Sequence, residues 1–420
     1  MSVLAPPRLV DDPGFERRAL GPFLARARAL LRRQLRTGLA RVDLESALDH
    51  AYRSSPYYQG VFARAAIGRA DLERPTRALA ALPVTRRADL QRDFVSFLAA
   101  GQPRWALDRG WLGRSSGSTG APVPYLREPR TLAWFYAFLD FALAYAGLPG
   151  ARGDVVLLDA LGHLPDYEAR LPSFHGARFT KLAVGRADRL RELAPLVVTS
   201  DPDGLAPLAE LYLPRPPRLV LSSAFALDPG LRAAIAERTG AVVLEYYSTQ
   251  ETSVLAIGCR LGHGYHPLAG AAHLELHAGE VVVTTTNNLA FPLIRYAPGD
   301  RAEVAEGPCE CGLRGPRLTR LLGRTHETFV GTHGPFAANA LGPLLARLPV
   351  EEVELAQDSA SSLVLRYRAA RELSDECVAA LQSRLEELAG PVSLTRVRVE
   401  APLRRPGEKP RPFVPLGAAS

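Results

Sequence analysis

One short segment, residues 114–125 with the sequence RSSGSTGAPVPY, constrains this chain more than any other stretch. Its first half contains six small residues in a row: Ser115, Ser116, Gly117, Ser118, Thr119 and Gly120. The two glycines can take positive φ values, and a tight turn of this composition exposes N–H and hydroxyl donors that bind phosphate oxygens. No lysine follows the second glycine, so the segment does not match the loop of the P-loop NTPases. Taken alone, it predicts either a phosphate-binding loop or an ordinary polar surface loop.

Three later segments favour the first alternative. They are EYYSTQE at 245–251, PLIRYAPGD at 292–300 and LLGRTHE at 321–327. SSGSTGAP resembles the phosphate loop of adenylate-forming enzymes, and the later segments resemble, in the family's order, their Y-G-x-T-E, R-Y-x-x-G-D and G-R hinge elements. The chain is therefore similar to the phenylacetate–CoA ligase-like branch of this superfamily. Two earlier segments, SSPYYQGVF at 54–62 and LPVTRRADL at 82–90, resemble its entry region, and we assign them no chemistry.

The composition fits a large two-domain protein without a nucleic-acid or membrane partner. The 420 residues are 47% hydrophobic, which is enough for a sizeable core and two domains. The net charge is +7, but the basic residues are scattered between acids and form no stripe for nucleic acid. No signal peptide and no apolar run of membrane-spanning length is visible, and four cysteines are no disulfide framework in so long a chain. We expect a cytoplasmic protein.

The hydrophobic pattern predicts an α/β fold with two domains. Arg-rich amphipathic helices occupy residues 15–53, and a mostly apolar helix follows the phosphate loop at 131–146. Between 154 and 247, strands alternate with helices, which indicates a parallel or mixed sheet covered by helices. We predict a large N-terminal adenylation domain at 1–323, mainly helical over 1–100, and a small α+β C-terminal lid domain at 324–420.

The resemblance implies where ATP would bind. The phosphate loop, from Ser115 to Gly120, would hold the β- and γ-phosphates, and Thr249 would meet the α-phosphate. Asp300 would accept hydrogen bonds from the ribose hydroxyls. Two short segments would flank the adenine: Ser223, Ala224 and Phe225 on one side, and Tyr246, Tyr247 and Ser248 on the other.

Four positions depart from the family's pattern. Tyr247 stands where the family has glycine, and the acid that coordinates Mg²⁺ falls on Gln250, with Glu251 one place later. An amide is a poorer Mg²⁺ ligand than a carboxylate, so either Glu251 serves as the ligand or metal-dependent adenylation is impaired. His326 replaces the acid of the hinge, and Ala121 replaces the lysine that is common in the phosphate loop.

A second group of residues predicts a structural zinc site. Cys309 and Cys311 form a C-x-C-G knuckle, and Cys259 precedes them with two histidines nearby. Three cysteines and one histidine make a credible tetrahedral site, with His266 as our preferred fourth ligand and His263 as the alternate. Because every ligand would be a protein group, the role would be structural. The alternative is that these cysteines and histidines are unrelated.

Lysine is rare in this chain: all but two of the 51 basic residues are arginines, and the exceptions are Lys181 and Lys409. The segment PGEKPRPFV at 406–414 resembles the C-terminal element that carries the family's catalytic lysine. The resemblance implies that Lys409 bridges the reacting carboxylate and the α-phosphate. It also implies that the lid turns about Arg324 between the two half-reactions. For Lys409, an ordinary solvated turn residue is the alternative.

The predicted function is ATP-dependent activation of a carboxylic acid as an acyl adenylate, followed by transfer of the acyl group to a thiol. Coenzyme A is the expected acceptor. The expected cofactors are ATP, Mg²⁺, coenzyme A and structural Zn²⁺, the partners are small molecules, and a homodimer is compatible with this interpretation. One alternative is an adenylating enzyme with an amine or a carrier thiol as acceptor. The other is a non-catalytic protein on the same fold that binds an acyl adenylate or a nucleotide.

Overall fold

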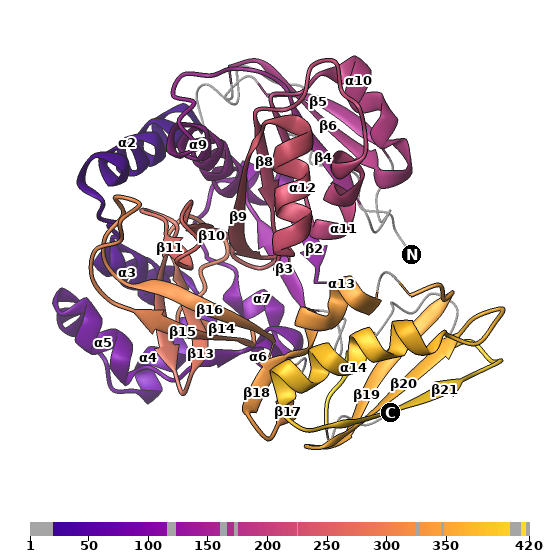
Figure 1. Ribbon diagram of the computed structural model, residues 1–420. Helices are drawn as coiled ribbons and strands as arrows, with labels where there is room; N and C mark the ends of the chain where they lie inside the picture. Colours follow the sequence, from indigo (N-terminus) through magenta and orange to yellow (C-terminus); the bar gives the residue numbers. More distant parts are fainter. Residues whose placement is uncertain are drawn as a thin grey trace.

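The computed structural model describes residues 20–115, 123–159, 166–171, 175–224, 226–324, 328–345, 348–403 and 413–416. Its centre is one 14-stranded sheet (Figure 1). Five neighbouring strands are parallel: β9 (Val242–Thr249), β8 (Leu219–Ser222), β7 (Val197–Ser200), β4 (Val155–Asp159) and β6 (Ala177–Ala183). Parallel strands covered on both faces read as apolar runs, which is why the sequence predicts most of them. The predicted α/β class is confirmed.

Helices cover both faces of the parallel strands (Figure 1). α9 (Pro129–Tyr145) packs beside α2 (Gly21–Thr37), and both share a core with alternate strand residues such as Val155 and Val197. α12 (Pro229–Thr239) packs on the opposite face. The two faces arise because successive residues of a strand point to opposite sides. Neither α9 nor any other helix within the described ranges is both long and apolar enough to span a membrane.

Local capping signals fix the ends of α12. The Asp228 carboxylate accepts a hydrogen bond of 3.0 Å from a backbone N–H in the first turn, and Pro229 starts the helix. Gly240 ends the helix with φ 67°, in the left-handed region where glycine is favoured. The sequence therefore predicts this helix without information from tertiary contacts.

A buried glutamine ties α2 to a distant part of the chain. The side-chain amide of Gln34 donates to the carbonyl of Pro267 at 2.8 Å and accepts from the N–H of Ala269 at 2.9 Å. One turn later, Gly38 ends α2 with φ 75°, and a Cβ at this position would lie 2.5 Å from the carbonyl oxygen of Gly312. Glycine meets both requirements, the positive φ and the close approach.

The other half of the large sheet is antiparallel and continues from β9. Its main strands are β10 (Ser253–Gly258), β11 (Tyr265–Pro267), β12 (Ala272–His277), β13 (Glu280–Thr285), β15 (Asp300–Ala305) and β16 (Arg317–Arg324). A β-branched run at 280–286 and a short strand pattern at 301–305 predict only β13 and β15 among these. β10, for example, is buried along its whole length like the parallel strands, but no helix follows it in the sequence to mark a strand–helix–strand unit.

Short N-terminal helices pack against this antiparallel half. They are α3 (Leu44–Ser54), α4 (Pro56–Arg64), α5 (Pro75–Ala81) and α6 (Arg87–Arg92). They share a core with Phe291 and Tyr296. Just before α6, strand β1 (Thr85–Arg86) pairs in parallel with β14 (Tyr296–Ala297). This pairing holds the start of α6 against the sheet.

The C-terminal residues form separate sheets with a core of their own. Four strands make one sheet: β19 (Glu352–Ser359), β20 (Ser362–Arg368), β21 (Ser393–Arg398) and β22 (Phe413–Val414). α14 (Asp375–Ala389) contributes to the same core, and β17 (Thr328–Gly331) forms a hairpin with β18 (Gly334–Ala337). Figure 1 draws these elements in orange and yellow. Because β16 ends at Arg324, we propose to divide the chain into domains at 323–324.

Candidate active site and metal centre

The predicted nucleotide-binding residues that the structure describes meet at the edge of the sheet where β8 and β9 end. Ser223 and Ala224 follow β8, Tyr246 to Thr249 end β9, and Asp300 begins β15. The carboxyl ends of parallel strands are where ligands gather in open α/β sheets. Ala224 has φ 77°, a value that is uncommon for a residue other than glycine. Several predicted residues lie outside the described residues: 116–120, Phe225 and Lys409, and for Arg324 only the backbone is described.

Tyr247 contacts the acid that is predicted to bind the ribose. Its phenol donates a hydrogen bond of 2.6 Å to Oδ2 of Asp300. The tyrosine ring is buried in an apolar cluster that includes Leu255 and Val283. The side chain that replaces the family's glycine thus holds one carboxylate oxygen of Asp300 in place.

Tyr246 lies on the opposite face of β9, toward α9. Its ring centroid is 5.4 Å from that of Phe138, a residue of α9. Its hydroxyl is 3.4 Å from Oγ1 of Thr199 on β7. Two hydroxyl groups and an aromatic ring therefore lie between α9 and the carboxyl ends of these strands. Ser248 follows on β9 and pairs with Val254 of β10.

The turn after β9 sends two neighbouring side chains in different directions. Oγ1 of Thr249 accepts a hydrogen bond of 3.2 Å from a backbone N–H three residues later, which tightens the turn. Gln250 is exposed, and its amide oxygen accepts from the hydroxyl of Tyr125 at 3.1 Å and from Arg127 at 3.2 Å. Glu251 is directed inward, and its side chain is 0% exposed.

Glu251 is paired with Arg87 beside the first residue of the phosphate loop. Arg87 donates from Nη1 to Oε1 of Glu251 at 3.1 Å and from Nη2 to Oγ of Ser115 at 3.2 Å. The second carboxylate oxygen, Oε2, is buried and has no hydrogen-bond partner among the described residues. Ser115 in turn exchanges two hydrogen bonds, of 2.8 and 2.9 Å, with Val123, and these close the base of the loop. A buried carboxylate with a spare oxygen suits a cation.

Sequence reasoning missed Arg87, because its position depends on contacts far away in the chain. The pairing of β1 with β14 sets the start of α6, and Arg295 secures the segment before β1. The Arg295 guanidinium donates to the carbonyl of Leu82 and pairs with Oε1 of Glu275 at 2.7 Å. The available signal was the basic position of the L-P-x-x-x-(K/R)-x-D-L motif, which Arg87 fills.

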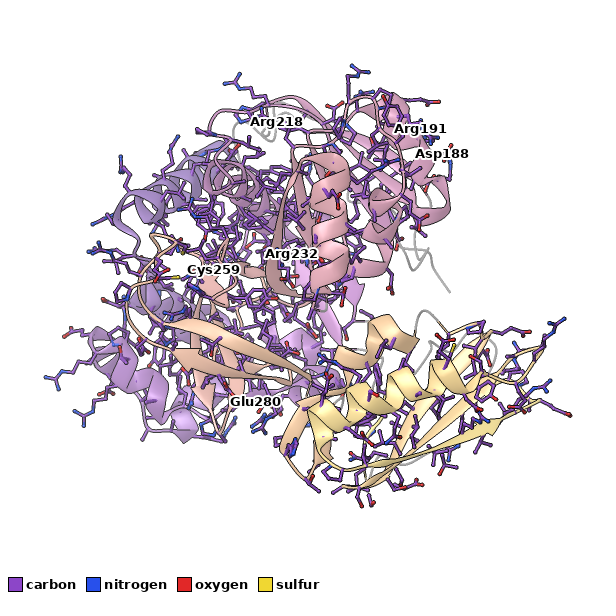
Figure 2. All side chains as sticks on the ribbon, in the orientation of Figure 1. Asp188, Arg191, Arg218, Arg232, Cys259 and Glu280 are labelled. Atoms are coloured by element: carbon purple, nitrogen blue, oxygen red, sulfur yellow. The ribbon has the colours of Figure 1, made fainter. Side chains whose placement is uncertain are left out.

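The predicted metal ligands come together in one buried group. Cys259, His266, Cys309 and Cys311 place their sulfur and nitrogen atoms within 4.8 Å of one another. Sγ of Cys259 is 3.7 Å from Sγ of Cys309, and Nε2 of His266 is 3.3 Å from Sγ of Cys311. The alternate ligand, His263, lies beside this group, with its Nδ1 at 3.3 Å from Sγ of Cys309. Figure 2 labels Cys259 in the large body of the molecule.

These distances fit a tetrahedral metal centre. Zinc–sulfur bonds of about 2.3 Å and zinc–nitrogen bonds of about 2.1 Å place neighbouring ligand atoms about 3.5–3.8 Å apart. Burial, with the charges of Arg317 and His263, lowers the pKa of His266 to about 4, which keeps its imidazole in the neutral form that binds metals. β10 spans about 17 Å from the turn after β9 to the cysteine after Gly258. The metal centre is therefore remote from the residues around Glu251.

Comparisons with known proteins agree on one fold. No family model matches the chain. It is 26% identical over 318 residues to a phenylacetate–coenzyme A ligase of Thermus thermophilus, with 68% of this chain and 70% of that protein covered. A structure of 2-hydroxyisobutyryl-CoA ligase in the postadenylation state gives a TM-score of 0.64 at 18% identity, covering 98% of this chain and 94% of that one. O-succinylbenzoate coenzyme A synthetase from Bacillus subtilis, in complex with ATP and magnesium, gives 0.50 at 16% identity, with coverages of 71% and 68%.

Proposed function

We propose that this chain activates a carboxylic acid with ATP and transfers the acyl group to coenzyme A. It has the fold of the adenylate-forming CoA ligases, and its sequence resembles that of phenylacetate–CoA ligase. The observation that carries the proposal is the meeting of Ser115, Thr249, Glu251 and Asp300 at one edge of the sheet. A nucleoside triphosphate needs these groups: hydroxyl donors for phosphate, one acid for a metal ion and another for the ribose.

The reaction has two steps. In the first, an oxygen of the substrate carboxylate attacks the α-phosphorus of ATP, pyrophosphate leaves, and an acyl adenylate forms. In the second, the thiolate of coenzyme A attacks the acyl carbon and AMP leaves, so that a thioester forms. Both steps depend on holding the reactants in line and on stabilising negative charge, and the protein contributes to both.

In this proposal each group around the nucleotide has one task. Asp300 accepts hydrogen bonds from the ribose hydroxyls while Tyr247 holds its other oxygen. Thr249 donates to the α-phosphate, and the loop from Ser115 to Gly120 binds the β- and γ-phosphates. The adenine lies between residues 223–225 and 246–248.

We assign the magnesium contact to Glu251 rather than to Gln250. Glu251 is a carboxylate beside Ser115, and one of its oxygens lacks a protein partner among the described residues. The amide oxygen of Gln250 already accepts two hydrogen bonds, from Tyr125 and Arg127. When bound, Mg²⁺ would neutralise charge on the phosphates. Arg87 would then share the carboxylate with the metal.

We also propose a structural zinc ion bound by Cys259, His266, Cys309 and Cys311. The donor set of three thiolates and one imidazole suits Zn²⁺, and it leaves no position open for a substrate. The knuckle of Cys309 to Gly312 follows β15, whereas Cys259 follows β10 and His266 lies in β11. Zinc would fasten these segments of the antiparallel half together.

For the lid we propose that Lys409 bridges the carboxylate and the α-phosphate during adenylation. A rotation about Arg324 then removes it and opens the path for coenzyme A. A binding protein without turnover remains the rival, because Gln250 and Tyr247 depart from the family's residues.

One assay tests the proposal and separates the rivals. Exchange of labelled pyrophosphate into ATP, measured across a panel of aryl and short-chain acids, reports adenylation directly. Adding coenzyme A and measuring thioester separates a CoA ligase from an enzyme that uses an amine or a carrier thiol. No exchange with any acid, together with tight binding of ATP, would favour the binding protein.

A further inference from the structure

We infer that Lys181 and Asp159 form the far end of the acid-binding site, where they select a carboxylic acid that carries a hydroxyl group remote from the reacting carboxylate. This inference rests on the proposed function and names the class of substrate. The Nζ of Lys181 lies 2.7 Å from Oδ2 of Asp159, and the two side chains are 3% and 16% exposed. A hydroxyl is complementary to this pair because it can donate to a carboxylate and accept from an ammonium.

The strand register places the pair on the face of the sheet that α9 covers. Leu157 of β4 lies opposite Lys181 on one side and Thr199 on the other. Val155 and Val197, two residues earlier on β4 and β7, belong to the core under α9. Since side chains alternate along a strand, Asp159, Lys181 and Thr199 point to that same face. The pair thus shares a face with Thr199 and the Tyr246 hydroxyl beside it.

Stability does not account for this ion pair. Taking two charges out of water costs several kcal/mol, and replacing a buried pair by apolar residues is often neutral or stabilising. The chain also uses lysine here although it uses arginine almost everywhere else. A compact ammonium on a flexible stem leaves room for a ligand beside it, whereas a planar guanidinium fills more of that space.

The pair lies within reach of an acid bound at the end of β9. Asp159 is the last residue of β4, at the same edge of the sheet as the residues that end β8 and β9. Three strand spacings separate β4 from β9, which is about 14 Å, and Leu157 and Tyr246, on the same face of these strands, are only partly buried. On the outer side, Tyr167 of β5 (Tyr167–Leu171) lies opposite Lys181, and its ring packs on Phe179 at 6.1 Å, which screens the pair from the sheet edge.

The test compares matched acids in the pyrophosphate exchange assay. The pairs are octanoate with 8-hydroxyoctanoate, and 3-phenylpropanoate with 3-(4-hydroxyphenyl)propanoate. We expect wild type to favour the hydroxylated member by at least about tenfold in kcat/KM, because the hydroxyl would add hydrogen bonds to two charged groups, and such bonds are stronger than those between neutral groups. The double variant Lys181→Met with Asp159→Leu should lose or reverse this preference and keep or raise the melting temperature.

A second ion pair on the same two strands supplies the control. Arg178 of β6 binds Asp154, the residue before β4, at 2.7 Å near the amino ends of the strands. Arg178→Met should therefore keep the preference for the hydroxylated acid. Two results would overturn the inference and leave the proposed function standing. One is equal use of the two acids of each matched set by wild type, and the other is a preference for the hydroxylated acid that survives in the double variant. No exchange with any acid and no binding of ATP would overturn both.

Discussion

The pair of Arg87 and Glu251 allows stability and catalysis to be tested separately. The Glu251 side chain is fully buried and Arg87 is 19% exposed, so neither charge is well solvated. Removing one partner of a buried pair leaves an uncompensated charge and typically costs about 3–5 kcal/mol. We therefore expect Arg87→Met to lower the free energy of unfolding by an amount in this range. Glu251→Gln should cost less, because an amide can still accept from the guanidinium.

The double variant Arg87→Met with Glu251→Gln should recover most of the lost stability, since no buried charge remains. Its pyrophosphate exchange should stay low, because the proposed metal contact is gone. Urea titration gives the free energies of the four proteins in the cycle, and the exchange assay gives their rates. Arg92→Met is the matched control, since Arg92 lies on the same helix and pairs with Asp89 while 72% exposed. It should cost at most about 1 kcal/mol.

Three results would refute parts of this reasoning. If Arg87→Met costs no more than Arg92→Met, Glu251 is not held by a buried charge pair. If the effects of Arg87→Met and Glu251→Gln on stability simply add, the two side chains do not interact in solution. Full exchange activity in Glu251→Gln would remove its assignment as the metal ligand, whatever its stability.

Four further predictions follow from the same sites. The purified protein should contain about one zinc per chain by elemental analysis. Cys309→Ser should lose the zinc and have a lower melting temperature, because structural zinc supplies on the order of 10 kcal/mol of folding free energy. Freshly purified protein without zinc would contradict this prediction. Gln250→Ala should slow exchange less than Glu251→Gln, and the reverse ranking would move the metal contact to Gln250. Tyr247→Phe should raise KM for ATP several-fold with little change in KM for the acid, and an unchanged KM for ATP would argue against the ribose assignment. Lys409→Ala and Lys409→Arg should lower exchange by about 10²–10³ but keep thioester formation from supplied acyl adenylate, and near wild-type exchange would make Lys409 an ordinary surface residue.

Local signals in the sequence predict the parallel half of the fold well. α12 has its capping aspartate, its first-turn proline and its terminal glycine within a dozen residues, so its ends need no tertiary information. Strands such as β10 escape prediction because they lack the alternating pattern of a half-buried strand and have no helix beside them in the sequence to mark a strand–helix–strand unit. The motifs likewise locate the candidate site at the ends of β8 and β9.

The individual roles within that site are harder to predict, because they depend on contacts between distant residues. The sequence leaves Gln250 and Glu251 open as metal ligands, since only the turn after β9 sends one outward and the other inward. Arg87 reaches Glu251 across 164 positions, through a strand pairing that has no local signature. The metal group is different: its cysteine knuckle is a local pattern, and the four predicted residues do meet.

The bridge made by Gln34 has a consequence for how the protein is synthesised. Its hydrogen-bond partners, Pro267 and Ala269, lie 233 and 235 positions later in the chain. At about 5–20 residues per second, a ribosome needs about 10–50 s to produce them after Gln34 has been added. During this time α2, with its apolar residues Leu24 and Leu31, already exists, but the segment that binds Gln34 has not yet been made. The amide of Gln34 on α2 is thus translated long before the two backbone groups that it binds.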